Sequence, residues 1–423
     1  MRKERFSKWL FLCLIPIILL TVGLIAGCTT GGDDITDEVE PSRVKSWTVL
    51  VYLCADNDLY YEGWTDMNEM EKVGSTDSVN IVVQFDQNPE FSSDYNFGEK
   101  GCGRYIMTRN PQNEIGEVTS PQVEWLGDVN SGDPDTLVNF VKWGMKNYPA
   151  NKYAVILWNH GAGWRAKGAR TRAIKGICYD SEYNDHISEY ELKQAFDQIR
   201  ENYGQKVEFI GMDACLMGMV EVAYDVQDAG KWLVASSETV PGTGWPYDYF
   251  LADLREDPAM SGQDLARTVV TRYKQYYDDN SVTTTDIAAT SLDRINTVVT
   301  AVNNFADDAV TKIDAEKDNL LTAQTEAQHM SYSDFVDIND FMYQVTQNVT
   351  DTGLTGLATN VMGALETTVV YEYHGASLAT NTGGLSIWLP DLNFYSTYVT
   401  SYTALPFAED TEWPEFLQVL LAN

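Results

Sequence analysis

The sequence predicts an α/β protein with a mostly parallel central sheet flanked by helices, followed by a C-terminal α+β subdomain. Two observations support this class. Short apolar runs recur between residues 47 and 241, and each run is continuously apolar, as expected for strands that a parallel sheet buries on both faces. Amphipathic helical patterns separate the runs, and an alternation of strands and helices is typical of a sheet covered by helices.

The individual elements can be placed from their flanking residues. Asp133 before Pro134 marks a helix start, and Ser188 with Glu191 has the spacing of a capping box. After about residue 255 the alternation loosens, and two late strand-like runs, which could join the main sheet, precede a terminal helix. The expected central strands are 47–56, 80–86, 153–161, 207–215 and 232–241, and shorter runs at 103–110 and 175–180 are expected in hairpins near the edge or rim of the sheet.

The first residues have the pattern of an export signal. Basic residues precede an apolar run, Leu10 to Gly27, that ends in small residues, which favours a cleaved signal over an uncleaved N-terminal anchor, the alternative. Residues 25–28 resemble a bacterial lipobox. This resemblance implies that residues 1–27 are removed and that Cys28 is lipidated, which anchors the exported protein to the lipid membrane or cell surface. Residues 28–46 are rich in Gly, Thr and acids and predict a flexible tether.

Charge and cysteine content limit the partners and the chemistry. The net charge is −33, which excludes nucleic acid as a partner, because a phosphate backbone would repel such a body. The cysteines beyond Cys28 are too few and too unevenly spaced for a disulfide scaffold. Cys54, Cys102 and Cys178 are expected in ordinary disulfides or as buried inert thiols. Cys215 differs from them because of its position at a strand end.

Two of the expected central strands end in chemically active residues. One ends in His160 and Gly161, and the next ends in Asp213-Ala214-Cys215. The active groups of an open parallel sheet lie beyond the carboxyl ends of its strands, so neighbouring strands would bring the imidazole and the thiol to the same rim. A helical pattern directly after Cys215 predicts that the thiol lies at a helix N-terminus, which would lower its pKa. A reactive thiol beside an imidazole provides the parts that acyl transfer requires.

Each of these residues also has an ordinary structural explanation. A single cysteine after a strand is usually a small buried hydrophobe, and a single histidine is usually structural. The pair at matching strand ends favours the catalytic interpretation. Gly161 adds to it, because a residue without a side chain lets its backbone N–H approach a reacting carbonyl and form an oxyanion hole with the N–H of Cys215.

The segments around these residues resemble one peptidase family. VILWNHGAGW, FIGMDACLMGMVEVAY, ASSETVPGTGWPY and GGLSIWLP are similar to the clostripain family, within a group that includes caspases, legumain and gingipains. The resemblance implies a caspase-like sandwich with a catalytic domain at 47–255 and a C-terminal subdomain at 256–423. It also implies a cysteine endopeptidase in which Cys215 attacks the scissile carbonyl and His160 protonates the leaving amine, with Gly161 and Cys215 in the oxyanion hole.

The same resemblance implies polypeptide substrates with Arg or Lys before the scissile bond. Asp213 is the expected acid of the pocket for that side chain, and the alternative is a carboxylate that only orders the Cys215 loop. Family pockets can hold a second acid where this chain has Thr243, which would weaken the basic preference, and Glu238 is a weaker substitute. The basic segment 164–176 lies where family members are cut during self-activation, although a solvated basic loop explains it equally well. The expected cuts follow Arg165, Lys167, Arg170, Arg172 or Lys175.

Two acid-rich segments, 56–63 and 179–185, raise the question of a metal. Some clostripain-family members bind calcium, but neither segment has EF-hand spacing, so solvated acidic loops are the preferred interpretation and no metal ligand is predicted. No cofactor is expected, with calcium left open. The alternative function is a non-catalytic surface lipoprotein that binds peptides or proteins with the same fold. A serine hydrolase is disfavoured, because the chain lacks a G-x-S-x-G motif.

Overall fold

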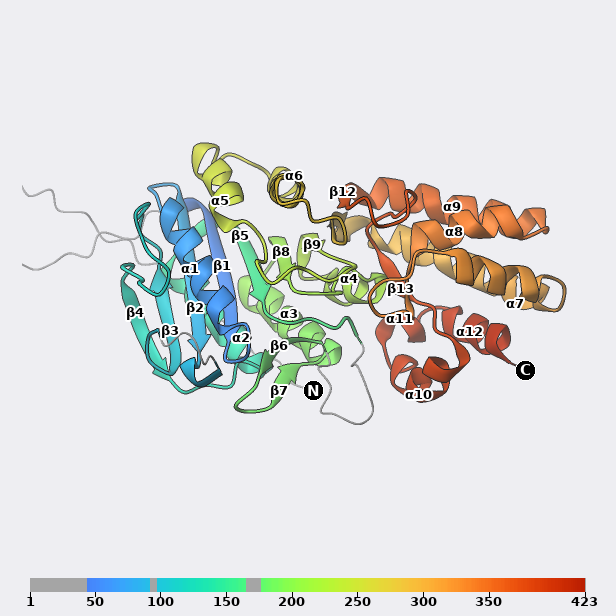
Figure 1. Cartoon of the computed structure of the whole chain (residues 1–423), viewed down its shortest axis with the longest axis horizontal. Helices are drawn as coiled ribbons and strands as arrows, with labels where there is room; N and C mark the ends of the chain where they lie inside the picture. Colours follow the sequence, from blue (N-terminus) through green and yellow to red (C-terminus); the bar gives the residue numbers. More distant parts are fainter. Residues whose placement is uncertain (1–43, 92–96, 165–175, 423) are drawn as a thin grey trace, which may run out of the picture. The chain divides into compact units, whose positions relative to one another are not determined.

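A nine-stranded mixed sheet forms the centre of the protein, as seen in a computed structural model that describes residues 44–91, 97–164 and 176–422 (Figure 1). The strands are β1 (Lys45–Ala55), β2 (Val79–Gln87), β3 (Gly101–Ile106), β4 (Gln122–Gly127), β5 (Ala150–Trp158), β8 (Val207–Asp213), β9 (Gly230–Ala235), β10 (Asp286–Ser291) and β12 (Val369–His374). They lie in the order β12-β10-β9-β8-β5-β1-β2-β3-β4. The strands from β9 to β2 pair in parallel, and those at both edges pair antiparallel. The predicted parallel centre is confirmed.

The sheet is buried on both faces because the side chains of its central strands alternate between two hydrophobic cores. In β1, Leu50 and Tyr52 belong to one core, and Val49 and Val51 belong to the other. This two-sided burial explains why the strands are continuously apolar in sequence. The first core is closed by helices that include α2 (Pro134–Asn147), α3 (Glu189–Tyr203) and α4 (Val220–Val226), and the second by α1 (Tyr60–Val73), α5 (Tyr247–Glu256) and α6 (Gly262–Asp279).

The helix starts follow the predicted signals. The Asp133 side chain accepts a hydrogen bond from Asp135 N (2.9 Å), directly before Pro134 begins α2. Ser188 and Glu191 make both hydrogen bonds of a capping box at the start of α3. A side-chain cap of this kind contributes about 1 kcal/mol to stability, so these residues help to fix where the layers over the sheet begin.

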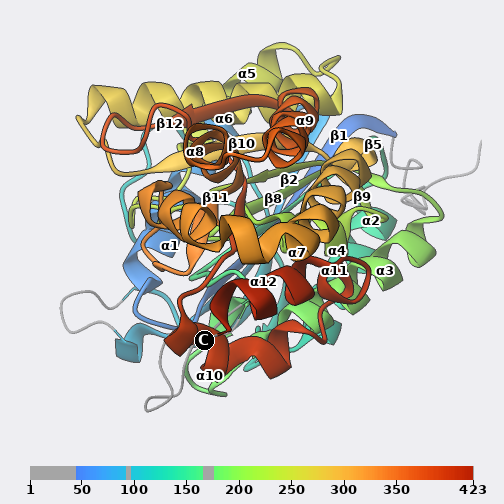
Figure 2. The ribbon, with the colours of Figure 1, turned by 90° about the vertical axis from the view of Figure 1, so that its right-hand side faces the viewer.

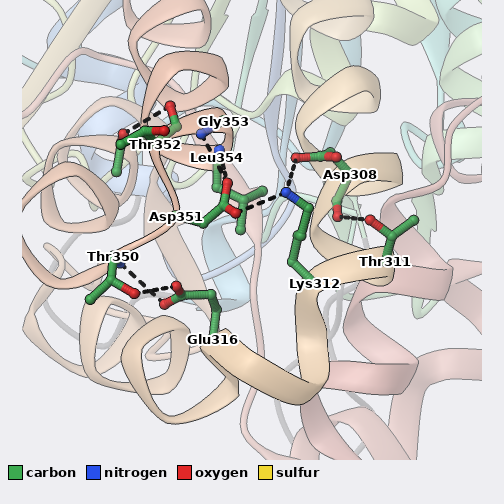
Figure 3. A network of polar contacts seen from close by, with 10 residues as sticks. Asp308, Thr311, Lys312, Glu316, Thr350, Asp351, Thr352, Gly353 and Leu354 are labelled. Atoms are coloured by element: carbon green, nitrogen blue, oxygen red, sulfur yellow. Dashed lines mark hydrogen bonds and ion pairs between the residues drawn. The ribbon is translucent and has the colours of Figure 1, made fainter.

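The C-terminal half adds further helices to the first core, and they lie in the foreground of Figure 2. These are α7 (Ile295–Glu326), α8 (Ile338–Asn348), α9 (Thr352–Thr368), α10 (Leu392–Tyr402), α11 (Pro406–Glu409) and α12 (Trp413–Leu421). Polar contacts fasten the start of α9 to α7: Lys312 donates to Asp351 (2.9 Å), and Glu316 accepts from the Thr350 hydroxyl (Figure 3). Two short 3₁₀ helices, η1 (Pro89–Phe91) and η2 (Leu292–Arg294), complete the described helices.

The remaining strands divide between the main sheet and two small sheets. β12 joins the main sheet, whereas β13 (Ser386–Trp388) pairs with β11 (Phe335–Asp337). β6 (Ile177–Asp180) and β7 (Asp185–Ile187) form the hairpin expected of the run at 175–180. All described residues belong to one compact unit, Ser42–Asn423, and the domain boundary after residue 255 stays a prediction.

Several strand boundaries differ from those expected, and one strand was not expected at all. The run at 232–241 is a strand only as far as Ala235, and the loop that follows turns toward the ends of β5 and β8. β4 was not predicted, because this edge strand is largely exposed and lacks an apolar run. The predicted signal peptide, Cys28 and most of the tether lie outside the described residues. Among the helices that are described, none has the length and apolarity needed to cross a membrane.

Candidate active site

The adjacent parallel strands β5 and β8 end at matching positions. Trp158 pairs with Asp213 at the end of the ladder, and Asn159 N donates to Asp213 O (3.3 Å) just beyond it. His160 and Cys215 each stand two positions after this last pair. The sheet therefore delivers the imidazole and the thiol to the same rim.

His160 and Cys215 line one cavity of about 340 Å³. The cavity lies where the loops beyond β5, β8 and β9 converge, which is the usual place for reactive groups in an open parallel sheet. The other lining residues are Leu59, Trp158, Asn159, Asp213, Ala214, Thr239, Val240, Pro241, Gly242 and Gly244.

The thiol of Cys215 is partly buried against the loop after β9. Val240 N donates a hydrogen bond to Sγ (3.4 Å). Burial raises the pKa of Cys215; the Val240 backbone opposes the rise, and the carboxylates of Asp213 and Glu238 add to it. The predicted lowering of the thiol pKa is therefore wrong for the free enzyme, because desolvation and negative charge outweigh the backbone hydrogen bonds of Val240 and Cys215. The sulfur depends on a base to lose its proton.

The helix expected directly after Cys215 begins later. Leu216 has a positive φ of 62°, Met219 is extended and bridges to Ser386, and α4 starts only at Val220. The dipole effect of a helix falls off within its first turn. The thiol therefore lies on a turn fixed against β13 and not at a helix N-terminus, which is a second reason why its pKa is not lowered.

The ring of His160 is held by a carboxylate that sequence analysis missed. His160 Nε2 lies 2.7 Å from Oδ1 of Asp58, in the loop between β1 and α1. This hydrogen bond lowers the pKa of Asp58, which keeps the carboxylate ionised beside the imidazole. The Asp58 side chain is 80% exposed and that of His160 is 26% exposed, so solvent screens the pair. Its main effect is to orient the ring.

Two asparagines fix the segments that carry His160 and Asp58. Asn159 accepts from Tyr179 N (2.8 Å) and donates to Tyr179 O (3.0 Å). Asn57 donates to the same carbonyl (2.8 Å). Both loops are thus tied to β6, which limits how far the imidazole can move from the rim.

Gly161 lies where the two strand-end loops approach most closely. A Cβ at this position would overlap Cys215 O and would lie 2.9 Å from Ala214 Cβ. Only glycine allows this approach without moving the loop that carries the nucleophile. The geometry is compatible with the predicted oxyanion hole, in which the backbone N–H groups of Gly161 and Cys215 act together.

Asp213 lines the cavity, and a second carboxylate, that of Asp66, lies behind it beside Gly244 without lining the cavity. Asp213 is 3% exposed and accepts from Trp245 N (3.0 Å), and burial raises its pKa to about 7. A Cβ on Gly244 would lie 3.0 Å from an oxygen of Asp213 and 3.3 Å from an oxygen of Asp66. Asp66 belongs to α1 and also accepts from the indole of Trp158. Burial, with Glu69 and Asp213 nearby, raises the pKa of Asp66 well above its usual range.

Thr243 and Glu238, the other two predicted substrate contacts, do not line the cavity. The Thr243 hydroxyl lies 3.1 Å from that of Tyr277. The Glu238 carboxylate accepts from the backbone N–H groups of Thr239 (2.6 Å) and Ser331 (2.8 Å). Glu238 therefore orders the loop after β9, and the second acid near the cavity is Asp66, whose approach no local motif signals.

The described cysteines are all free thiols. Cys54, Cys102 and Cys178 are buried, and burial raises the pKa of Cys54 and of Cys102 well above the ordinary value. The interpretation as inert buried thiols is therefore correct for these three, and the alternative of ordinary disulfides is wrong.

The expected self-cleavage positions, Arg165 to Lys175, lie outside the described residues. The chain on either side is firmly packed. Trp164 contacts the rings of Trp388 and Tyr402 at centroid distances of 5.1 and 5.0 Å, and Ala162 N donates to Gly176 O (3.1 Å). The first end of the basic segment is therefore fixed by Trp164, and Gly176 at the other end is bonded to Ala162, two positions after His160.

Comparison with known proteins shows similarity along most of the chain. The Clostripain family model matches residues 51–419. Clostripain of Hathewaya histolytica is 28% identical over 437 aligned positions, which cover 90% of this chain and 81% of that protein. An inactive zymogen C11 protease from Parabacteroides distasonis superimposes with a TM-score of 0.66 at 18% identity, covering 87% of this chain and 98% of the other.

A second solved structure has the same fold. A secreted C11 cysteine protease from Bacteroides thetaiotaomicron, in complex with an irreversible peptide inhibitor, superimposes with a TM-score of 0.63 at 18% identity, covering 86% of this chain and 98% of the other. The predicted caspase-like α/β fold is confirmed by these likenesses. With a family match that extends over most of its length, this chain belongs to the clostripain family and is a cysteine endopeptidase.

Proposed function

We propose that the enzyme cleaves polypeptides after Arg or Lys through a Cys215–His160 dyad. The observation that supports this proposal best is the single cavity that His160, Cys215 and Asp213 line together. A nucleophile, a proton carrier and a buried carboxylate are the three groups needed to cut a peptide bond beside a basic side chain.

The contact that one ring nitrogen of His160 makes supports a path for the proton. His160 Nε2 faces Asp58, so Nδ1 is the atom that takes the thiol proton as sulfur attacks and returns it to the leaving amine. The raised thiol pKa makes this transfer concurrent with attack, because little thiolate exists beforehand. Asp58 stabilises the transient imidazolium, and the N–H groups of Gly161 and Cys215 bind the oxyanion.

The basic side chain of the substrate is placed between Asp213 and Asp66. Both carboxylates are buried beside Gly244, and both have raised pKa values. A buried cationic partner favours the ionised form, so an Arg or Lys side chain would expel the protons that the acids hold in the free enzyme. Asp66 supplies from α1 the second charge that Thr243 does not provide.

We also propose that the enzyme cuts itself within 165–175. The segment contains five Arg or Lys residues and begins five positions after His160, and Gly176, which follows it, accepts from Ala162 N (3.1 Å). A cut there would separate β5 from β8, which pair along the sheet from Ala154↔Phe209 to Trp158↔Asp213. The two fragments would therefore stay associated. We expect purified enzyme to show two bands on a denaturing gel and one peak in gel filtration, and Cys215→Ala to remain a single chain.

For localisation we propose export and lipid anchoring at Cys28. The lipobox-like residues 25–28 support it, and one structural relative is described as secreted. Metabolic labelling with a fatty acid tests this: label should enter the native protein and be lost in Cys28→Ser. If the native protein were exported without label, lipid anchoring at Cys28 would be rejected and only the signal peptide would remain supported.

Cleavage-site profiling on a peptide library tests the catalytic proposal directly. Native enzyme should cut after Arg and Lys, and both Cys215→Ala and His160→Ala should lose cleavage at all sites. Asp314→Asn, which removes an exposed acid on α7, is the control and should leave the profile unchanged. Full activity in His160→Ala, or a profile without preference for Arg and Lys, would overturn the corresponding part of the proposal.

A further inference from the structure

The loop that contacts the nucleophile is fixed through Glu238, which follows β9. The backbone O of Glu238 accepts from Leu216 N (3.0 Å), and its backbone N donates to Asp286 (2.8 Å). Leu216 comes directly after Cys215 in the chain. Two positions after Glu238, Val240 N donates to the sulfur of Cys215 (3.4 Å). A displacement of Glu238 would therefore disturb the surroundings of the thiol from two directions.

The carboxylate of Glu238 joins this loop to the C-terminal half of the chain. Glu238 is 5% exposed, and its side chain accepts from the backbone N–H groups of Thr239 (2.6 Å) and Ser331 (2.8 Å). Ser331 belongs to a tight hairpin, residues 328–337, that follows α7 and ends in β11. A buried acceptor shared by two segments fixes them to each other, because the loss of either bond would leave a polar group unpaired.

His329 holds this hairpin against the end of α7. Its Nδ1 lies 2.5 Å from Ser333 O within the hairpin, and its Nε2 lies 2.8 Å from Gln324 O in the last turn of α7. Both partners are carbonyl oxygens, which only accept hydrogen bonds. A neutral imidazole donates through one nitrogen, so both bonds form only when the ring is an imidazolium.

The charged side chains on the elements next to His329 make hydrogen bonds to other groups. They are Lys317 and Glu326 of α7, Asp334 and Asp337 of the hairpin, Asp340 of α8 and Asp391 before α10. Lys317 and Asp391 line the same cavity as His329. The two hydrogen bonds of the ring nevertheless go to backbone carbonyls, so the ring connects two segments of main chain.

We propose that Glu238 and His329 are positioning residues for the nucleophile. His329, as the imidazolium, fixes the hairpin, and the hairpin holds the Glu238 carboxylate through Ser331 N. Glu238 in turn fixes the loop on which the thiol of Cys215 rests. The C-terminal half thereby aligns the thiol without touching the substrate. This inference rests on the proposed function, because it takes Cys215 as the nucleophile.

Glu238→Gln tests the link at its centre. Glutamine keeps one acceptor oxygen but turns an amide N–H₂ group toward the second backbone N–H, so one of the two bonds is lost. We expect kcat to fall about tenfold to a hundredfold, because a misplacement of about 1 Å at the reacting atoms is enough for this. KM should change by less than about threefold. Lys312→Gln, which removes the contact with Asp351 in the same half (Figure 3), is the control and should leave kcat unchanged.

His329→Gln tests the outer end of the link, and it provides the test if Glu238→Gln does not fold, because the ring is only partly buried. We expect kcat to fall about three- to tenfold. Residues that act through one network have non-additive effects, so the double variant should lose no more activity than Glu238→Gln alone. Losses that multiply would show two independent effects and would overturn the link.

The pH profile tests the charge on the ring. Dividing the kcat of native enzyme by that of His329→Gln at each pH cancels the titration of Cys215 and His160, which both enzymes share. The ratio should fall as pH rises from about 5.5 to 8, because a neutral ring donates only once. A constant ratio would show that the charge on the ring is not needed and would reject the imidazolium.

Two further results separate this proposal from the proposed function. Full kcat in Glu238→Gln and His329→Gln, beside an inactive Cys215→Ala, would overturn the positioning roles alone. A fall in Tm without a fall in kcat at 25 °C would assign both residues a structural role and would also overturn them. Activity in Cys215→Ala would remove the nucleophile itself, and both proposals would fail together.

Discussion

Replacing Asp213 by Asn separates a role in substrate binding from a role in ordering the Cys215 loop. Asparagine has nearly the same volume and still accepts the hydrogen bond from Trp245 N, so the loop should keep its conformation. The negative charge beside the substrate's basic side chain is lost. We therefore expect a large fall in kcat/KM for a substrate with Arg at the cleaved position and little change for one with citrulline, which has the shape of Arg without its charge.

The magnitude follows from burial. Asp213 is 3% exposed, and removing one partner of a buried charge pair costs about 2–5 kcal/mol. Asp66 remains beside Gly244 and keeps part of the attraction, so the lower end, about 2–3 kcal/mol, applies. At 1.36 kcal/mol per decade this is a fall of about 30- to 150-fold in kcat/KM for Arg, against less than about threefold for citrulline.

The pH dependence provides a second measurement on the same variant. Burial raises the pKa of Asp213 to about 7, and only the ionised form attracts a cation. With native enzyme, kcat/KM for the Arg substrate should therefore rise from pH 5.5 to 8, with a steeper rise than for citrulline. In Asp213→Asn the two profiles should become parallel. An equal loss for both substrates would refute the binding role and support the alternative, a carboxylate that only orders the loop.

Three further predictions concern the rim and the buried acids. Asp58→Asn should lower kcat/KM only about two- to fivefold, because an exposed pair contributes about 0.2–1 kcal/mol; a loss of a thousandfold in steady-state assays would show that substrate buries it. Gly161→Ala should abolish most activity, because the added Cβ would overlap Cys215 O. The control is Gly363→Ala, in α9 with open space around it, which should be fully active and slightly more stable in thermal melts. In EDTA the free energy of unfolding should fall between about pH 4 and 7. Burial raises the pKa of Asp286, Asp337 and Glu221 to about 7, above unfolded values of about 4. The folded state therefore holds more protons than the unfolded state in this window, and it loses their stabilisation as pH rises. Urea unfolding at pH 5.5 and 8 measures this, and greater stability at pH 8 would contradict it.

Sequence analysis located the rim because the relevant signals are local. Continuous apolarity identified β5 and β8 as buried parallel strands, and parallel strands place their carboxyl ends together. His160 and Cys215 could therefore be paired across 55 positions without knowing the contacts between them. The capping residues Asp133 and Ser188 were equally local, and both helix starts were predicted correctly.

The missing acids depend on packing between distant elements. Asp66 lies beside Gly244 and near Asp213 only because α1 packs over the sheet and places its carboxylate against the Trp158 indole, 92 positions away. Asp58 meets His160 across 102 positions. In the sequence both residues stand among other acids of the same segment, and no spacing distinguishes a buried carboxylate from a solvated one.

The error in the thiol pKa also comes from contacts between distant segments of the chain. The apolar pattern after Cys215 suits a helix, but Leu216 turns the chain into a positive φ and Met219 pairs with a strand from the far C-terminal half. The sulfur therefore lacks a helix N-terminus, and burial, with smaller contributions from the carboxylates of Asp213 and Glu238, raises its pKa. A site built to attract a basic side chain necessarily disfavours a free thiolate, so the two requirements oppose each other until the substrate arrives. On the proposed function, a cationic side chain bound beside Asp213 would offset the part of the pKa rise that this carboxylate causes, and binding of the correct substrate would thereby help to activate the nucleophile.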